Sequence, residues 1–308
     1  MKKILLTGSS GFVGTNLSEA FKDDFTLFGL DVFNNGKIDK DSFLTWDELE
    51  LLPEVDVIIH LAGKAHDTSS KALEKEYFDV NVGLTKQIYD HFLKSSAQKF
   101  IFFSSVKAAA DTVKGDQLYE DDEPNPLTPY GKSKLEAESY IQSYPLPKNK
   151  EVYILRPAMI HGPGNKGNLN LLYNLVKKGI PWPLGAFNNK RSFASIDNVV
   201  FILKELLSKN IPSGIYQIAD DLPISTNELI QLMSEVLGKK TRIWNIPTSV
   251  IHSISALGDW LHLPLNSERL KKLTETYIVS NMKIKKVLTV DSLPTNMREG
   301  LIKTLKSF

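Results

Sequence analysis

A tyrosine and a lysine stand four residues apart in TPYGKSK, residues 128–134. Thr128 is a good helix N-cap and Pro129 suits the first helical position, so Tyr130 and Lys134 are expected on one face of a new helix. A cation beside a phenol stabilises the phenolate and lowers the pKa of the tyrosine from its reference of about 10. Such a tyrosine can give or take a proton near neutral pH. The same spacing is common on surface helices, so the pair alone does not predict catalysis.

A glycine-rich loop near the N-terminus favours the catalytic interpretation. The sequence LLTGSSGFVG places Gly8, Gly11 and Gly14 between an apolar strand pattern and an amphipathic helix pattern. Gly8 would make the tight turn, Gly11 would let a pyrophosphate approach the backbone, and Gly14 would let the helix pack closely. The helix N-terminus then offers N–H groups to the phosphates. This context indicates a dinucleotide-binding loop rather than a plain turn.

An aspartate ends the second apolar run at the position where a ribose-binding carboxylate is expected. Asp31 follows Gly14 by 17 residues, close to the spacing of about 20 that is typical of dinucleotide sites. A carboxylate accepts hydrogen bonds from both ribose hydroxyls and repels a 2′-phosphate, which favours NAD over NADP. The alternative is an aspartate that only caps a turn.

The elements that must position these residues alternate along the first half of the chain. Apolar strand patterns at 2–8, 25–31, 55–63, 99–105 and 151–160 are separated by helical patterns at 11–23, 82–96 and 134–142. Such alternation predicts an α/β fold with a Rossmann-type doubly wound parallel sheet.

The second half of the chain has a different texture. Glycine- and proline-rich loops separate helical patterns at 168–178, 197–209, 226–237, 248–260 and 296–306, with short strand candidates at 214–219 and 241–247. We expect residues 1–160 to form the dinucleotide-binding domain, with returns to it near 186–215 and 241–262. Residues 161–308 are expected to form mainly a small C-terminal α/β substrate lobe.

Composition excludes several classes of function. The chain has 308 residues, with 37 Lys and Arg against 36 Asp and Glu, so no basic field predicts nucleic-acid binding. It has no cysteine, which rules out disulfides, thiolate nucleophiles and cysteine-based zinc sites. Because no two histidines stand at i, i+4, we expect no metal. The absence of a signal-peptide or membrane-spanning pattern predicts a cytoplasmic protein without membrane association.

Six motifs occur in an order that identifies a family resemblance. They are TGSSGFVG, DVIIHLAG, FFSSV, PYGKSKLEAE, LRPAMIHGPG and RSFASIDNVV. The chain resembles the extended short-chain dehydrogenase/reductases, in their NAD-dependent nucleotide-sugar epimerase/dehydratase branch. The resemblance implies a catalytic set of Ser105, Tyr130 and Lys134. It also implies a homodimer built through the helices near 82–96 and 129–143.

Cofactor contacts are implied for the glycine loop, for segments that follow other strands and for the catalytic pair. These residues are Gly8, Ser10, Gly11, Phe12, Val13, Gly14, Asp31, Leu61, Ala62, Gly63, Asn81, Ser104, Tyr130, Lys134 and Pro157. For Ser104, a strand-end serine in a turn is an equal alternative.

Substrate contacts are implied with wider alternatives. Arg191 precedes SFASIDNVV, and its guanidinium would bind the nucleotide diphosphate through paired N–H hydrogen bonds. Lys272 or Arg269 would add a second cation, and Lys107 is either a substrate contact or a solvated loop lysine. The full set is Ser105, Lys107, Met159, Asn168, Leu169, Arg191 and Lys272.

The reaction is narrowed by two residues after the catalytic serine. The family's 4,6-dehydratases carry Asp and Glu where this chain has Val106 and Lys107, which disfavours dehydration. We expect an NAD-dependent 4-epimerase of a nucleotide sugar, most simply a UDP-hexose. The alternatives are an NAD(P)H-dependent reductase of UDP-4-keto-6-deoxy-hexoses, including N-acetylated ones, and a dinucleotide-sensing regulator without catalysis.

Overall fold

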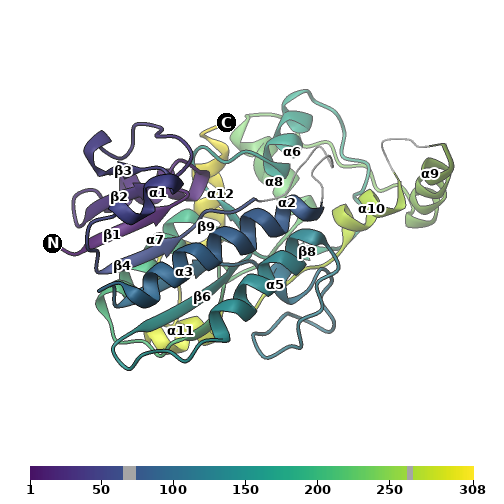
Figure 1. The fold of residues 1–308 in the computed structure, drawn as a ribbon. Helices are drawn as coiled ribbons and strands as arrows, with labels where there is room; N and C mark the ends of the chain where they lie inside the picture. Colours follow the sequence, from purple (N-terminus) through teal and green to yellow (C-terminus); the bar gives the residue numbers. More distant parts are fainter. Residues whose placement is uncertain (65–73, 262–265) are drawn as a thin grey trace.

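A parallel sheet forms the centre of the molecule (Figure 1). The computed structural model describes residues 1–64, 74–261 and 266–308. The sheet has the strand order β10-β6-β5-β4-β1-β2-β3, and every neighbouring pair is parallel. The strands are β1 (Lys3–Thr7), β2 (Thr26–Leu30), β3 (Phe43–Leu44), β4 (Val57–His60), β5 (Lys99–Phe103), β6 (Glu151–Pro157) and β10 (Gly214–Ile218). The predicted Rossmann-type architecture is confirmed, with the strand order reversing between β1 and β4.

Helices cover both faces of this sheet because its strands are apolar on both sides. On one face, α1 (Phe12–Phe21), α7 (Ile196–Ser208) and α11 (Met282–Leu288) bury their apolar sides against alternate residues of β1, β4, β5 and β6. On the other face, α3 (Leu84–Lys94) and α5 (Pro129–Gln142) pack against the remaining alternate residues and run side by side in Figure 1. A short helix α2 (Glu74–Phe78) and a π-helical turn (Asp79–Gly83) precede α3.

The helix that carries the tyrosine and lysine begins as predicted. The Thr128 hydroxyl accepts a hydrogen bond of 3.2 Å from the N–H of Gly131, and Pro129 is the first residue of α5. The cap satisfies one of the free N–H groups and fixes where the first turn starts. It therefore sets the position of Tyr130 above the sheet edge.

A second lobe is built from the C-terminal half of the chain. Its core joins α6 (Asn168–Lys177), α8 (Thr226–Val236), α9 (Thr248–Leu261), α10 (Ser267–Thr274) and α12 (Met297–Leu305). Two small sheets link it to the rest, one from β7 (Met159–His161) and β9 (Phe193–Ser195), the other from β8 (Lys190–Arg191) and β11 (Ile224–Ser225).

Two segments of the C-terminal half, 186–215 and 241–262, were expected to return to the dinucleotide-binding domain. Within 186–215, α7 covers the sheet and β10 begins at its edge. Within 241–262, the described residues 241–261 add no strand to the large sheet. Instead Ile243 and Asn245 form isolated bridges to Trp182 and Leu184 of the lobe. The strand predicted at 241–247 is wrong, because its residues form only these isolated bridges within the lobe and no continuous strand.

Candidate active site

The residues singled out from the sequence gather at one edge of the sheet. Gly8 follows β1, Asp31 follows β2, Leu61 follows β4, Ser104 follows β5, and Pro157 ends β6. All five positions are at carboxyl ends of parallel strands, which meet at the same edge near the reversal of strand order. This edge is the ordinary place for a dinucleotide in such a sheet.

Ser105 and Tyr130 are joined at this edge. Ser105 caps the short helix α4 (Val106–Ala109), where its hydroxyl oxygen accepts a 3.1 Å hydrogen bond from the N–H of Lys107. A hydrogen bond between Ser105 and the Tyr130 phenol lowers the pKa of the tyrosine. The Tyr77 ring packs edge-on against Tyr130, with 6.3 Å between the ring centroids. The hydroxyls of Ser105 and Tyr130 are therefore placed to act on one oxygen atom of a substrate.

Burial dominates the ionisation of Tyr130 and corrects one expectation. Burial raises the pKa of Tyr130 above its usual 10, and the Ser105 hydrogen bond offsets only part of that rise. The predicted lowering of the pKa by Lys134 is wrong for the cofactor-free chain. The reason is geometric, because the Lys134 ammonium is directed to a backbone carbonyl on β5.

The Lys134 side chain is buried between the sheet and the loop after β4. Its Nζ donates a 2.9 Å hydrogen bond to the carbonyl oxygen of Phe103 and lies 4.9 Å from the centroid of the Phe102 ring. Burial lowers the pKa of Lys134 to about 8, while the carboxylate of Glu138 acts in the opposite direction. A Cβ added to Gly63 would lie 3.1 Å from this Nζ, so the ammonium is directly beside the loop expected to run past the cofactor.

The loop after β4 is fixed by Asn81 of the π-helical turn. The Asn81 amide oxygen accepts from the N–H of Lys64 at 2.7 Å, and its nitrogen donates to the Ser133 hydroxyl at 2.9 Å. Asn81 is fully buried. It therefore ties the predicted cofactor loop, with Leu61, Ala62 and Gly63, to the helix that carries Tyr130 and Lys134.

The glycine loop has the geometry that a pyrophosphate needs. Gly8 has φ of +68°, in the left-handed region, and a Cβ there would lie 2.7 Å from the backbone nitrogen of Ala62. A Cβ on Gly14 would lie 2.3 Å from the Gly8 carbonyl oxygen. Because the N-cap residue Gly11 has no side chain, none can cover the first N–H groups of α1, where Phe12 and Val13 lie. This cradle fits a dinucleotide.

Asp31 is held against the same loop. Its carboxylate accepts hydrogen bonds from the N–H groups of Ser10 at 2.8 Å and of Val32 at 2.7 Å. The Val32 bond is the local turn contact considered as the alternative role. The Ser10 bond fixes the carboxylate beside the glycine loop, where a ribose would meet it.

Ser104 has a structural partner. Its hydroxyl bonds the carboxylate of Glu138, which also receives Arg156 through contacts of 3.0 Å and 2.6 Å. Glu138 and Arg156 are 0% and 2% exposed, so this is a buried ion pair under the catalytic helix. The geometry favours the strand-end structural role for Ser104 over a cofactor contact.

Lys107 of α4, after β5, lies near two cations of the lobe, Arg191 and Lys272. The Lys107 ammonium lies 4.0 Å from the centroid of the Tyr277 ring and donates to the carbonyl of Asp111 at 2.9 Å. Burial lowers the pKa of Lys107; the charges of Arg191 and Lys272 lower it further, against Asp111 and Glu275. The structure thus brings together the cations proposed for substrate binding, and it makes Lys107 a largely buried group rather than a solvated loop lysine.

Arg191 and Lys272 are linked through the main chain. The Arg191 guanidinium donates to the carbonyl oxygens of Glu275, at 3.3 Å, and of Lys272. The Lys272 ammonium pairs with Glu268 at 2.6 Å on the exposed side of α10. Arg191 is therefore positioned by the end of α10, and Lys272 would have to leave Glu268 to reach a phosphate.

The remaining substrate-contact candidates lie where the chain passes from the sheet to the lobe. Met159 begins β7, two residues after Pro157 ends β6, and its side chain is partly exposed. Asn168 begins α6 and is exposed. The Leu169 side chain is buried in the lobe core. For Leu169, packing is the role that the structure displays.

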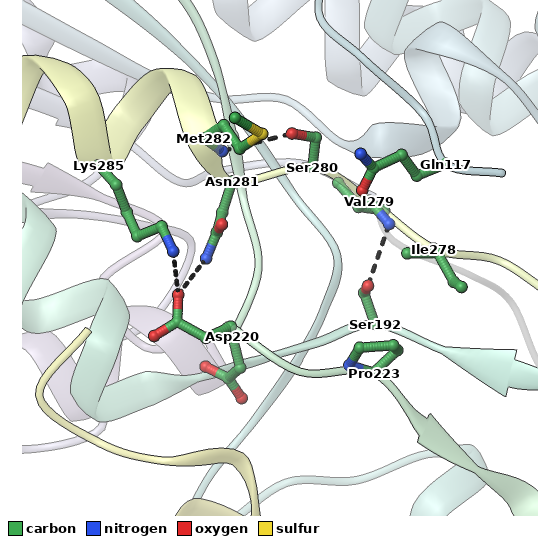
Figure 2. A pocket seen from close by; sticks show the side chains of 11 residues that line it. Gln117, Ser192, Asp220, Pro223, Ile278, Val279, Ser280, Asn281, Met282 and Lys285 are labelled. Carbon is green, nitrogen blue, oxygen red and sulfur yellow. Dashed lines mark hydrogen bonds and ion pairs between the residues drawn. The ribbon is translucent and has the colours of Figure 1, made fainter. Parts of the chain in front are cut away.

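A cavity of about 200 Å³ is lined by residues that include Ser192, the residue after Arg191, and Asn281 (Figure 2). Its lining includes Ser192, whose hydroxyl accepts from the N–H of Val279 at 3.0 Å. The Asp221 carboxylate accepts from Asn281 and Lys285, both at 2.8 Å. Lys285 and Asp221 pair with each other within this lining, which favours a structural role for the cavity. In the described part of the chain, no three His, Cys, Asp or Glu side chains group as they would around a metal ion.

Sequence reasoning missed Glu138, Arg156 and Tyr277. Glu138 stands four residues after Lys134, so helical spacing alone could have placed it one turn below the lysine. Tyr277 had no such signal, since its hydroxyl reaches the carbonyl of Val106 across 171 residues of sequence.

The chain is similar to known proteins along most of its length. Residues 4–219 match the model of the NAD dependent epimerase/dehydratase family. A UDP-glucose 4-epimerase of Vibrio cholerae is 33% identical over 81% of this chain and 79% of that protein. An N-acetyl-alpha-D-glucosaminyl-diphospho-ditrans,octacis-undecaprenol 4-epimerase of Escherichia coli O157:H7 is 29% identical over 98% of this chain and 94% of that protein. A UDP-glucuronic acid 4-epimerase from Bacillus cereus, solved with NAD, shares the fold with a TM-score of 0.75 at 21% identity, covering 99% and 98% of the two chains.

Proposed function

We propose that this chain, which belongs to the NAD-dependent epimerase/dehydratase family, inverts C4 of a hexose linked to UDP. The observation that carries the proposal is the joining of Ser105 to Tyr130 beside the buried Lys134, at the sheet edge that holds the glycine loop. The glycine loop and Asp31 would hold NAD, which would supply reversible hydride transfer at C4.

The chain's own groups supply the proton chemistry. Ser105 would hydrogen-bond the reacting O4 and orient it toward Tyr130, which exchanges the O4 proton. Lys134, with its ammonium beside Gly63, would hold the ribose hydroxyls of the cofactor. The positively charged nicotinamide of bound NAD, placed near the Tyr130 phenol, would reduce the pKa that burial now raises.

Cofactor choice follows from Asp31. Its carboxylate is fixed by Ser10 and would repel a 2′-phosphate, which supports NAD over NADP. The remaining expected cofactor and substrate contacts are proposals on the same footing, as are the homodimer through α3 and α5 and the cytoplasmic location. Within the described ranges, no helix is long and apolar enough to cross a membrane.

The test is to incubate the protein with UDP-glucose or UDP-N-acetylglucosamine, without added cofactor, and to follow C4 by NMR. We expect the galacto isomer to form with no net redox change. The Tyr130→Phe variant should bind substrate and lose activity by a factor of about 10² to 10⁴. Consumption of NADH with UDP-4-keto-6-deoxy sugars, with no inversion of UDP-hexoses, would instead establish the reductase.

A second candidate substrate is a hexose N-acetylated at C2 and carried on a polyprenyl diphosphate. The relative from Escherichia coli O157:H7, which this chain matches over 98% of its length, is named for that substrate. The sugar diphosphate and the C4 chemistry are the same, so the proposed residues keep their roles. Inversion of the lipid-linked sugar, with UDP-sugars unchanged, would select this candidate.

A further inference from the structure

The helix α9 exposes an apolar stripe. Val250, Ile254, Leu257 and Leu261 stand at i, i+4, i+7 and i+11, which places them on one face of a helix. Each is between 44% and 50% exposed. Trp260, which borders the stripe, is 76% exposed. Contiguous exposed apolar side chains of this kind mark interaction sites.

The stripe is not the face with which α9 packs on its own lobe. The buried residues of α9 are Ile251, Ser255 and Gly258. Ile251 joins the lobe core together with Leu270 of α10, and Asp259 accepts from the N–H of Ser267 at 3.0 Å. On a helical projection these buried positions lie about a quarter turn from the stripe. The helix therefore has one face for the lobe and another apolar face turned outward.

Basic residues stand before and after this helix along the chain. Residues 239–274 contain six Lys and Arg and two acidic residues, although charges nearly balance over the whole chain. All six basic residues are exposed: Lys239, Lys240, Arg242, Arg269, Lys271 and Lys272. Arg269, Lys271 and Lys272 belong to α10, which packs beside α9, so positive charge lies next to this helix.

The location of α9 leaves this surface accessible. In Figure 1 it lies at the edge of the molecule, beyond α10 and away from the central sheet. The last turns of α10 also carry the carbonyl of Lys272 that positions Arg191. The stripe is thus on the substrate lobe and close along the chain to the proposed diphosphate site.

We propose that α9 docks the protein on an anionic lipid bilayer, which replaces the expectation of no membrane association. The stripe and Trp260 would lie at the boundary between acyl chains and headgroups. An amphipathic helix with Leu, Ile and Trp outward and basic residues beside it binds such a boundary in the plane of the membrane. Tryptophan favours the interface, and Lys and Arg are attracted to anionic headgroups. The docked lobe would meet a diphosphate-linked sugar held at the membrane surface.

A second copy of the chain is disfavoured as the occupant of this surface. A two-fold contact places the same patch against itself. The basic residues of the neighbouring α10 would then approach those of the second copy and repel them. Anionic headgroups complement both the apolar stripe and its charge.

The test is sedimentation of the full-length protein with vesicles of phosphatidylcholine, alone or mixed with phosphatidylglycerol. We expect binding to the mixed vesicles that weakens with salt, and a blue shift of tryptophan emission that Trp260→Phe removes. The triple variant Ile254→Ser/Leu257→Ser/Trp260→Ser should bind at least about tenfold more weakly. A matched control replaces three exposed leucines elsewhere, Leu51→Ser/Leu171→Ser/Leu222→Ser, and should bind as the wild type does.

Three results would overturn the proposal. They are no binding to mixed vesicles, an equal loss in the control variant, or a wild-type dimer in light scattering that the α9 variant alone dissociates. Circular dichroism checks that the variants fold. Vesicle binding needs no catalysis, so its failure is independent of whether the protein inverts C4.

Discussion

The Lys134 ammonium donates a 2.9 Å hydrogen bond to the carbonyl oxygen of Phe103, the last residue of β5. The bond joins the catalytic helix to the strand that delivers Ser105, and it holds a charged group inside the protein. Lys134 is 4% exposed, and burial lowers its pKa to about 8. The position at which we propose that Lys134 acts is thus one that destabilises the folded chain.

Removal of this charge should stabilise the cofactor-free protein while it abolishes activity. A pKa of about 8 against 10.5 in a free lysine corresponds to a cost on the order of 3 kcal/mol, and loss of the hydrogen bond offsets about 1 to 2 kcal/mol. Lys134→Met should therefore raise the free energy of unfolding at pH 7 by about 1 to 2 kcal/mol. Denaturant titration measures it.

The pH dependence gives the control. Between pH 8 and 10.5 the unfolded chain binds more protons at Lys134 than the folded chain does. The free energy of unfolding of the wild type therefore rises relative to that of the variant as pH rises. The advantage of Lys134→Met should shrink across that window. A variant that is less stable at pH 7, by an amount that does not change with pH, contradicts this account.

The Glu138–Arg156 pair should behave as a buried unit. Removal of either partner, by Glu138→Gln or Arg156→Met, leaves the other polar group buried and should cost about 3 to 5 kcal/mol. The double variant should cost less than the sum of the singles, as measured in a denaturant double-mutant cycle. Arg298→Met, in a pair with side chains 56% and 61% exposed, should cost under about 1 kcal/mol. Additive costs at the buried pair would rule out coupling.

Two glycines allow a matched test of the cofactor loop. A Cβ at Gly14 would lie 2.3 Å from a backbone oxygen and 2.7 Å from the Cα of Ser9, whereas a Cβ at Gly83 meets nothing within 4 Å. Gly14→Ala should lower the melting temperature and the NAD content of the purified protein, measured after acid release. Gly83→Ala, at a helical position, should be neutral or stabilise by up to about 1 kcal/mol. Equal effects of the two changes would contradict the packing argument.

The sequence predicted the sheet, and with it the gathering of the candidate residues at one edge, because those features depend on local patterns. Strand and helix periodicity gave the alternation, and the spacing of Gly8, Gly11 and Gly14 gave the cofactor loop. The cap at Thr128 predicted where α5 starts. Each of these depends on neighbours within one or two turns of the chain.

The features that were missed depend on contacts between distant segments. Ser195 caps α7, and Asp197 in its first turn pairs with Lys303 at 2.7 Å across 106 residues. Spacing placed Tyr130 and Lys134 on one face and could not show that the ammonium turns to Phe103. Burial and rotamer choice, which the fold decides, determine both pKa shifts.

The carboxylate of Asp31 should determine which dinucleotide binds. Asp31→Asn keeps an acceptor for the Ser10 N–H, which now bonds the carboxylate at 2.8 Å, and removes the charge that repels a 2′-phosphate. We expect the ratio of the NADPH to the NADH dissociation constant to fall by at least about tenfold, as measured by fluorescence titration. Asp39→Asn, on an exposed residue of the neighbouring loop, removes the same charge away from the glycine loop and should leave the ratio unchanged. A ratio that shifts equally in both variants would mean that the general field of the protein, rather than Asp31, selects the cofactor.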